Sequence, residues 1–142
     1  MQIATFGHKH IFTNDGGIEV VLSDLVPLLA KENNVTVYDR YELDGDYKTP
    51  QNVPENVTIK HAPTFKKGAV NAQLASLTAT IKCMFGKYDI VHVHAEGPCV
   101  FLPLLKLAGK KVVVTIHGLD WQRAKWGKFA RWYIHLGEKM AA

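Results

Sequence analysis

Residues 88–118 read YDIVHVHAEGPCVFLPLLKLAGKKVVVTIHG, and this stretch decides the fold. Two apolar runs rich in β-branched residues, 90–94 and 112–116, flank a short segment of helical length, 100–107. Runs as apolar as these are typical of strands that are buried on both faces of a sheet. Two strands joined by a helix form a parallel pair with a right-handed crossover. The stretch therefore predicts one unit of an α/β fold.

The same alternation runs through the rest of the chain. Further strands are predicted over residues 2–6, 35–38 and 57–60, and further helices over 18–31, 70–85 and 121–140. Pro27 is expected to kink the first of these helices, because proline removes a backbone hydrogen bond. Residues 40–56 are polar and contain two prolines, so we interpret them as an exposed excursion. The expected fold is a Rossmann-like, doubly wound, mainly parallel sheet of five or more strands with helices on both faces.

The composition is that of a soluble globular domain. The chain has 142 residues, of which 47% are hydrophobic and 21% charged, and we expect a single domain over residues 1–142. Cys83 and Cys99 have no metal-ligand spacing and are interpreted as reduced thiols of a cytoplasmic protein. The amino terminus lacks the basic region of a secretory signal, and no apolar run is long enough to span a bilayer.

Polar residues follow the predicted strands at the sheet edge where such folds bind ligands. Gly16 and Gly17 open the first helix, whose free N–H groups and positive dipole end favour a phosphate. Alternatively, the two glycines only relieve a tight turn. Glu19, in the first helical turn, is either a substrate contact or an acid that stabilises the helix dipole. These residues are candidates for binding a substrate or its donor.

His117 follows the predicted strand 112–116 directly and precedes a glycine. An imidazole at this edge can donate a hydrogen bond to a sugar hydroxyl or orient reacting groups, so His117 is the candidate catalytic residue. Other candidates for substrate or donor binding lie nearby, namely His94, Glu96, Gly118 and Asp120. His92 points to the same face as His94 but is interpreted as a core residue. A metal set made with His92 is disfavoured, because no carboxylate joins it at ligand spacing.

A basic aromatic segment follows His117. Its candidate residues for binding a membrane or an anionic acceptor are Lys125, Trp126, Lys128, Arg131 and Trp132. Basic side chains beside indole rings suit a surface of anionic lipids or an anionic lipid-linked substrate. The alternative interpretation is that the aromatic rings pack on the sheet and the basic side chains are simply solvated.

Three motifs resemble one family. Gly16-Gly17-Ile18-Glu19, residues 88–94 (YDIVHVH) and residues 113–118 (VVTIHG) together are similar to the amino-terminal domain of the "group 1" family of retaining GT-B glycosyltransferases. Residues 117–126 (HGLDWQRAKW) look, more narrowly, like the rhamnosyltransferases of bacterial surface-polysaccharide synthesis. The resemblance covers essentially the whole chain.

The resemblance implies a nucleotide-sugar donor, a lipid-linked saccharide acceptor, retention of anomeric configuration, and neither a metal nor another cofactor. It also implies that Gly16 and Gly17 lie against the donor diphosphate and acceptor, and that His117 contacts the transferred sugar. The donor-binding carboxyl-terminal domain of the family, with its Glu-x7-Glu element, is absent from this sequence. We therefore expect an amino-terminal, acceptor-side domain that is inactive alone, that belongs at or near the cytoplasmic membrane face, and that binds no nucleic acid.

Two rival interpretations remain. Asp39, at the end of the predicted strand 35–38, lies roughly where a nicotinamide-dependent Rossmann protein places its ribose-binding acid. The G-x-G-x-x-G spacing is missing, however, because eight residues separate Gly7 from Gly16. The second rival is a module that only binds a membrane surface.

Overall fold

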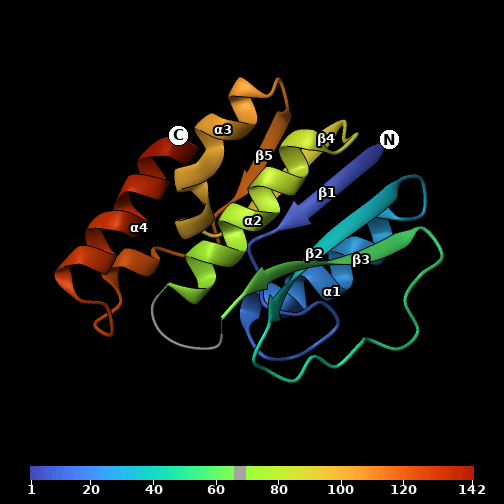
Figure 1. Ribbon diagram of the computed structural model, residues 1–142, viewed down its shortest axis with the longest axis horizontal. Helices are drawn as coiled ribbons and strands as arrows, with labels where there is room; N and C mark the ends of the chain where they lie inside the picture. Colours follow the sequence, from blue (N-terminus) through green and yellow to red (C-terminus); the bar gives the residue numbers. More distant parts are fainter. Residues whose placement is uncertain (66–69) are drawn as a thin grey trace.

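The computed structural model describes residues 1–65 and 70–142, and its elements form one parallel sheet with helices on both faces (Figure 1). In chain order, the elements are β1 (Gln2–Phe6), α1 (Gly17–Leu29), β2 (Asn34–Glu42), β3 (Val57–Thr64), α2 (Asn71–Phe85), β4 (Ile90–His94), the 3-10 helix η1 (Gly97–Phe101), α3 (Leu102–Leu107), β5 (Lys111–Thr115), the 3-10 helix η2 (Asp120–Gln122) and α4 (Lys128–Ala141). The five strands lie in the order β3-β2-β1-β4-β5, and every neighbouring pair is parallel. The predicted Rossmann-like α/β fold is confirmed.

Two apolar clusters hold the layers together. On one face, Leu22 and Val26 of α1 pack with Val35 and Val37 of β2. On the other face, α2 and α3 cover the sheet, and Figure 1 shows them opposite α1. The strand order reverses between β1 and β4, because the chain moves outward to β3 before it returns to β4 on the other side of β1. In open α/β sheets this switch point is where the loops diverge and leave a crevice.

The predicted elements are mostly found, with corrections at their ends. The helix predicted over 121–140 is wrong between 123 and 127, because η2 ends at Gln122 and α4 begins after Gly127, its N-cap. Glycine is a poor helix former in an interior position, which explains the break. The short helix predicted over 100–107 begins earlier as η1. Helix α1 continues through Pro27, and the kink there stays a prediction.

Two predictions of exposure are wrong. Residues 40–42 belong to β2 rather than to an exposed excursion, and Tyr47 returns to the sheet to donate a hydrogen bond to Asp39. Strand β5 is not buried on both faces, since Val113 is 47% exposed. The reason is the strand order, which puts β5 at the edge of the sheet. None of the helices in the described part of the chain has the length and apolar character to cross a bilayer.

Helix α4 is held by a close approach between backbones. A Cβ atom built on Gly137 would collide with the carbonyl oxygen of Glu96, which belongs to the loop between β4 and η1. Ile134 and Gly137 form the buried side of the helix. Any side chain at position 137 would therefore push α4 away from the loop that follows β4.

We expect Gly137→Ala to lower the free energy of unfolding by about 1–3 kcal/mol, the usual cost of overpacking a well-packed contact. Gly17→Ala is the matched control, because a Cβ atom at Gly17 meets no atom within 4 Å. Urea unfolding of both variants measures the difference. Equal stability of Gly137→Ala and the parent protein would contradict the close docking of α4.

Candidate functional site

A cleft of about 690 Å³ opens at the carboxyl ends of the strands, beside the switch point. Its lining includes most of the residues predicted from the sequence, namely Gly16, Gly17, Glu19, His117, Asp120, Lys125 and Trp126. The other predicted residues lie outside the lining, namely His94, Glu96, Gly118, Lys128, Arg131 and Trp132. The fold thus brings the start of α1 and the segment after β5 to one space.

Glu19 holds the loop between β1 and α1, which contains Gly16, through a hydrogen bond. The Glu19 carboxylate is buried, and its Oε1 accepts a hydrogen bond of 2.8 Å from the backbone N–H of Lys9. Its Oε2 would lie 2.5 Å from a Cβ atom on Gly16, so a glycine at 16 leaves room for this carboxylate. Gly17 is exposed and has open space around its Cα. The helix start therefore offers free N–H groups to the cleft, while Glu19 ties the β1–α1 loop to the helix.

Three histidines stand in a row across β4 and the end of β5. The ring centroids of His92 and His94 are 4.0 Å apart, and those of His94 and His117 are 5.2 Å apart. His92 is only partly buried and shares a hydrogen bond of 2.8 Å with Thr115 Oγ1, so its assignment to the core was wrong. Among the described residues, no three His, Cys, Asp or Glu side chains are arranged to hold a metal ion.

The hydrogen bond from His94 selects the tautomer of the neutral His117 ring. His94 is fully buried, and burial lowers its pKa from 6.5 to about 2, so its ring is neutral. Its Nε2 atom has no partner among the described residues, and an unpaired lone pair is less costly there than an unpaired N–H. We therefore assign the proton to Nδ1, which donates to Nε2 of His117 at 2.9 Å. His117 then carries its own proton on Nδ1, free to donate to a ligand in the cleft.

Glu96 positions the segment after β5. The side chain is fully buried, and its Oε2 accepts a hydrogen bond of 2.9 Å from the backbone N–H of Asp120. Burial raises the pKa of Glu96. Asp120 in turn pairs with Arg123 Nε at 2.9 Å. Gly118 has a φ of 157°, a conformation that favours glycine, so this residue shapes the segment through its backbone.

The predicted contacts of His94 and Glu96 with a ligand therefore need correction. Both side chains are 0% exposed, which leaves no atom for a ligand to touch in this structure. Each acts instead through a hydrogen bond to a residue that lines the cleft, His117 in one case and Asp120 in the other. They are positioning residues of the site.

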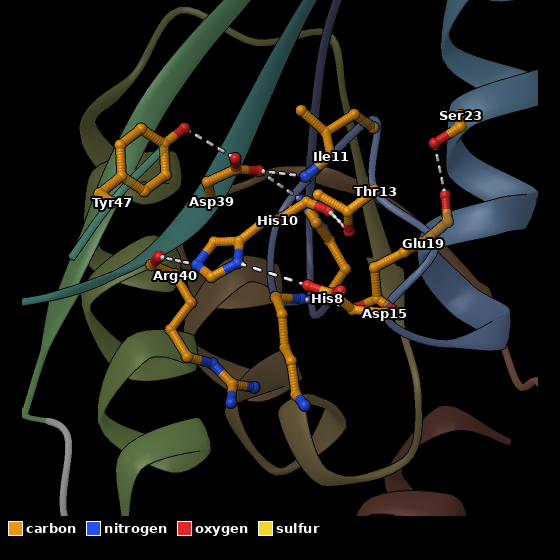
Figure 2. A network of polar contacts seen from close by, with 11 residues as sticks. His8, His10, Ile11, Thr13, Asp15, Glu19, Ser23, Asp39, Arg40 and Tyr47 are labelled. Atoms are coloured by element: carbon orange, nitrogen blue, oxygen red, sulfur yellow. Dashed lines mark hydrogen bonds and ion pairs between the residues drawn. The ribbon is translucent and has the colours of Figure 1, made fainter. Parts of the chain in front are cut away.

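Sequence reasoning missed a second buried network, which lies at the ends of β1 and β2 (Figure 2). Asp39 Oδ1 accepts hydrogen bonds from His8 Nε2 at 2.8 Å and from the backbone N–H of Ile11 at 3.0 Å. Asp39 Oδ2 accepts a third from Tyr47 at 2.9 Å. Asp39 is fully buried, so it cannot reach the ribose of a dinucleotide, and the observation that favoured a nicotinamide-dependent protein is lost. His117 was selected because it follows a strand at the ligand-binding edge of the sheet, and the same criterion also selects His8 after β1.

The basic aromatic segment divides between the cleft and the outer surface. Trp126 is partly buried in the cleft lining, with Lys125 Nζ 4.7 Å from its ring centroid. On α4, Phe129 is 75% exposed and Trp132 59% exposed, with their ring centroids 5.8 Å apart. The interpretation that all these rings pack on the sheet is therefore wrong.

The fold and the cleft define the class of protein. The chain is a Rossmann-like α/β domain with an open cleft at its switch point, where such folds bind ligands. The profile of the family described as Glycosyltransferase Family 4 matches residues 15–142. The chain belongs to this family and is a glycosyltransferase domain of the GT-B type, which confirms that part of the predicted resemblance. No protein of curated function matches the chain.

The buried, neutral His94 predicts how stability depends on pH. Below its ordinary pKa of 6.5 the unfolded histidine takes up a proton, whereas the folded one stays neutral down to about pH 2. This group alone should therefore lower the free energy of unfolding by about 1.4 kcal/mol for each pH unit below 6.5. We expect His94→Gln to show a shallower fall, measured by urea unfolding between pH 7 and pH 4.

The same substitution at His135, whose side chain is 44% exposed, controls for the loss of a histidine as such. Equal slopes for the parent and His94→Gln would contradict a histidine that stays neutral inside the fold.

Proposed function

We propose that this chain is the amino-terminal, acceptor-side half of a retaining hexosyl or deoxyhexosyl transferase that takes its sugar from a nucleotide-sugar donor. The proposed acceptor is a lipid-linked saccharide of bacterial surface-polysaccharide synthesis. The observation that carries this proposal is the meeting of the α1 start with His117 in one cleft. Similarity of residues 117–126 to rhamnosyltransferases supports a deoxyhexose as the transferred sugar.

Different residues of the cleft are proposed to bind the diphosphate and the sugar of the donor. The free N–H groups at Gly16 and Gly17 face the donor diphosphate, whose negative charge the helix dipole stabilises. Lys125, in the segment after β5, adds a positive charge to the lining of the cleft. His117 donates its Nδ1 proton to a hydroxyl of the transferred sugar. This division needs no metal ion, because the helix start and a basic side chain meet the diphosphate charge.

In the proposed transfer, the bond between the anomeric carbon and the diphosphate oxygen breaks, and the nucleoside diphosphate leaves with the bonding electrons. The acceptor hydroxyl forms the new bond to the same carbon on the same face, and its proton passes to the departing diphosphate oxygen. A second, donor-binding domain has to close over the cleft for this step. Closure holds both substrates in place, and orientation of this kind lowers a barrier by roughly 7–11 kcal/mol. Residues 1–142 alone are expected to bind nucleotide sugars weakly and to transfer nothing.

His117→Ala, made in a protein that includes the donor-binding domain, should lower the transfer rate at least tenfold and leave the fold intact. Loss of one hydrogen bond that strengthens in the transition state costs about 2–4 kcal/mol. The measurement is a transfer assay with a panel of nucleoside-diphosphate sugars. The control is His135→Ala, because His135 lies outside the cleft lining and pairs with Glu138. Unchanged turnover of the His117 variant would exclude the role proposed for this histidine.

We further propose that the outer side of α4 rests on the cytoplasmic face of the membrane. Phe129 and Trp132 are exposed apolar rings, and Lys128 and Arg131 are exposed cations on the same helix. Aromatic rings partition to the interface, while each basic residue near anionic lipid contributes about 1 kcal/mol. A lipid-linked acceptor would then be presented beside the cleft.

The double variant Phe129→Ser, Trp132→Ser and the double variant Lys128→Ala, Arg131→Ala should each sediment less with vesicles of anionic lipid than the parent chain. Added salt should weaken binding of the parent and of the aromatic variant, because screening acts on the retained cations. Vesicles of zwitterionic lipid are the control. Sedimentation of both variants equal to that of the parent would show that this side of α4 is simply solvated.

A further inference from the structure

Arg40 is a cation of the cleft that forms no ion pair with the described residues. It follows Asp39 near the carboxyl end of β2, and its side chain lines the cleft. Figure 2 shows this side chain running away from the His8–Asp39 network. Within residues 1–65 and 70–142, its guanidinium makes no hydrogen bond or ion pair, and Nε is shielded from solvent without a partner. Burial lowers the pKa of Arg40, and the charges of Glu42 and Glu19 offset only part of this effect, so the guanidinium is partly desolvated.

Glu42 and Glu19 attract the charge of Arg40, but neither carboxylate forms an ion pair with it. Glu19 holds the backbone of Lys9, and Glu42 Oε1 accepts a hydrogen bond of 2.8 Å from Asn71. Asp15, another acid of the lining, lies 3.9 Å from His10 Nδ1. Lys9 also lines the cleft and is exposed, so it adds a second cation. A partly desolvated charge without a partner destabilises a fold, and a bound anion would remove that cost.

The sheet order separates this cation from the position proposed for the sugar. Arg40 lies on β2 and His117 follows β5, with β1 and β4 between them. Three strand spacings amount to about 14 Å. The diphosphate proposed at Gly16 and Gly17 follows β1, the strand beside β2, and so lies between that sugar and Arg40. The separation therefore favours a phosphate, of either substrate, over the transferred sugar as the ligand of Arg40.

We propose that Arg40, assisted by Lys9, binds a phosphate group of a substrate in the cleft. A planar guanidinium offers two parallel N–H donors to a phosphate, which a lysine ammonium cannot reproduce. This inference rests on the proposed sugar transfer only for the two candidate sources of the phosphate, the donor and the acceptor. The phosphate site itself does not depend on that proposal.

The test measures binding of inorganic pyrophosphate to the chain, by calorimetry and by the Nε–Hε nitrogen resonances of its arginines. Pyrophosphate should shift the Arg40 resonance in the parent chain. Arg40→Met should bind pyrophosphate at least tenfold more weakly, and it should unfold at a higher temperature than the parent when no anion is present. Arg40→Lys should recover only part of the affinity. Arg123→Met is the matched control, because this cleft arginine is already paired with Asp120.

These binding measurements test the phosphate site at Arg40 without a transfer assay. An Arg40 resonance that does not move with pyrophosphate, or an Arg40→Met chain that binds it as the parent does, would overturn the site. A competition experiment separates the two sources of phosphate, the donor and the acceptor. Uridine, guanosine or thymidine diphosphate is added to the chain together with pyrophosphate. Pyrophosphate that still binds at Arg40 when the nucleotide is saturating supports the site with the acceptor as the source of the phosphate. Displacement from Arg40 by the nucleotide supports the site with the donor as the source, and leaves the proposed transfer itself standing.

Discussion

The cleft depends on a close contact between the ends of β1 and β4. Gly7 has a φ of 113°, and a Cβ atom at this position would collide with the carbonyl oxygen of His94. Only glycine meets both demands without strain. The two strand ends can therefore lie side by side while their loops leave toward opposite faces of the sheet, one to α1 and the other to η1. The space between the diverging loops is the cleft.

Buried polar networks fix the loops on each side of that contact. On the β2 side, Asp39 collects three hydrogen bonds and fastens the loop after β1. On the β5 side, His94 and Glu96 hold the segment that carries His117 and Asp120. Buried groups of this kind are costly when unpaired, so each network resists displacement of the loop that it holds. A rigid sheet with firmly held loops is what a site needs if its geometry is to be defined before a ligand arrives.

The sequence predicts the strands and the sheet edge that carries the site, because apolar runs and the strand-end rule depend on local order. It does not predict burial at that edge. Glu96 follows the same rule as His117, yet it is enclosed where α4 packs its Gly137 onto the loop after β4. His94 is enclosed at the end of a central strand, with Gly7 packed against its backbone. Both contacts join residues far apart in the chain. The exposure of β5 likewise follows from strand order, which the chain order does not reveal. Arg40 was missed because its polar surroundings were interpreted as solvent-exposed.

The two arginines that line the cleft, Arg123 and Arg40, differ in whether an ion pair offsets their charge. Arg123 is neutralised by Asp120, and that pair helps to hold the segment after β5 in place. Arg40, in contrast, is partly desolvated and has no ion pair within the described residues, although a neutral side chain of similar length would fit the same place at lower cost. Sites that bind ligands commonly retain such unfavourable groups, because the ligand supplies the missing partner. The two arginines of this lining therefore differ in kind, one serving the fold and the other an anion from outside it.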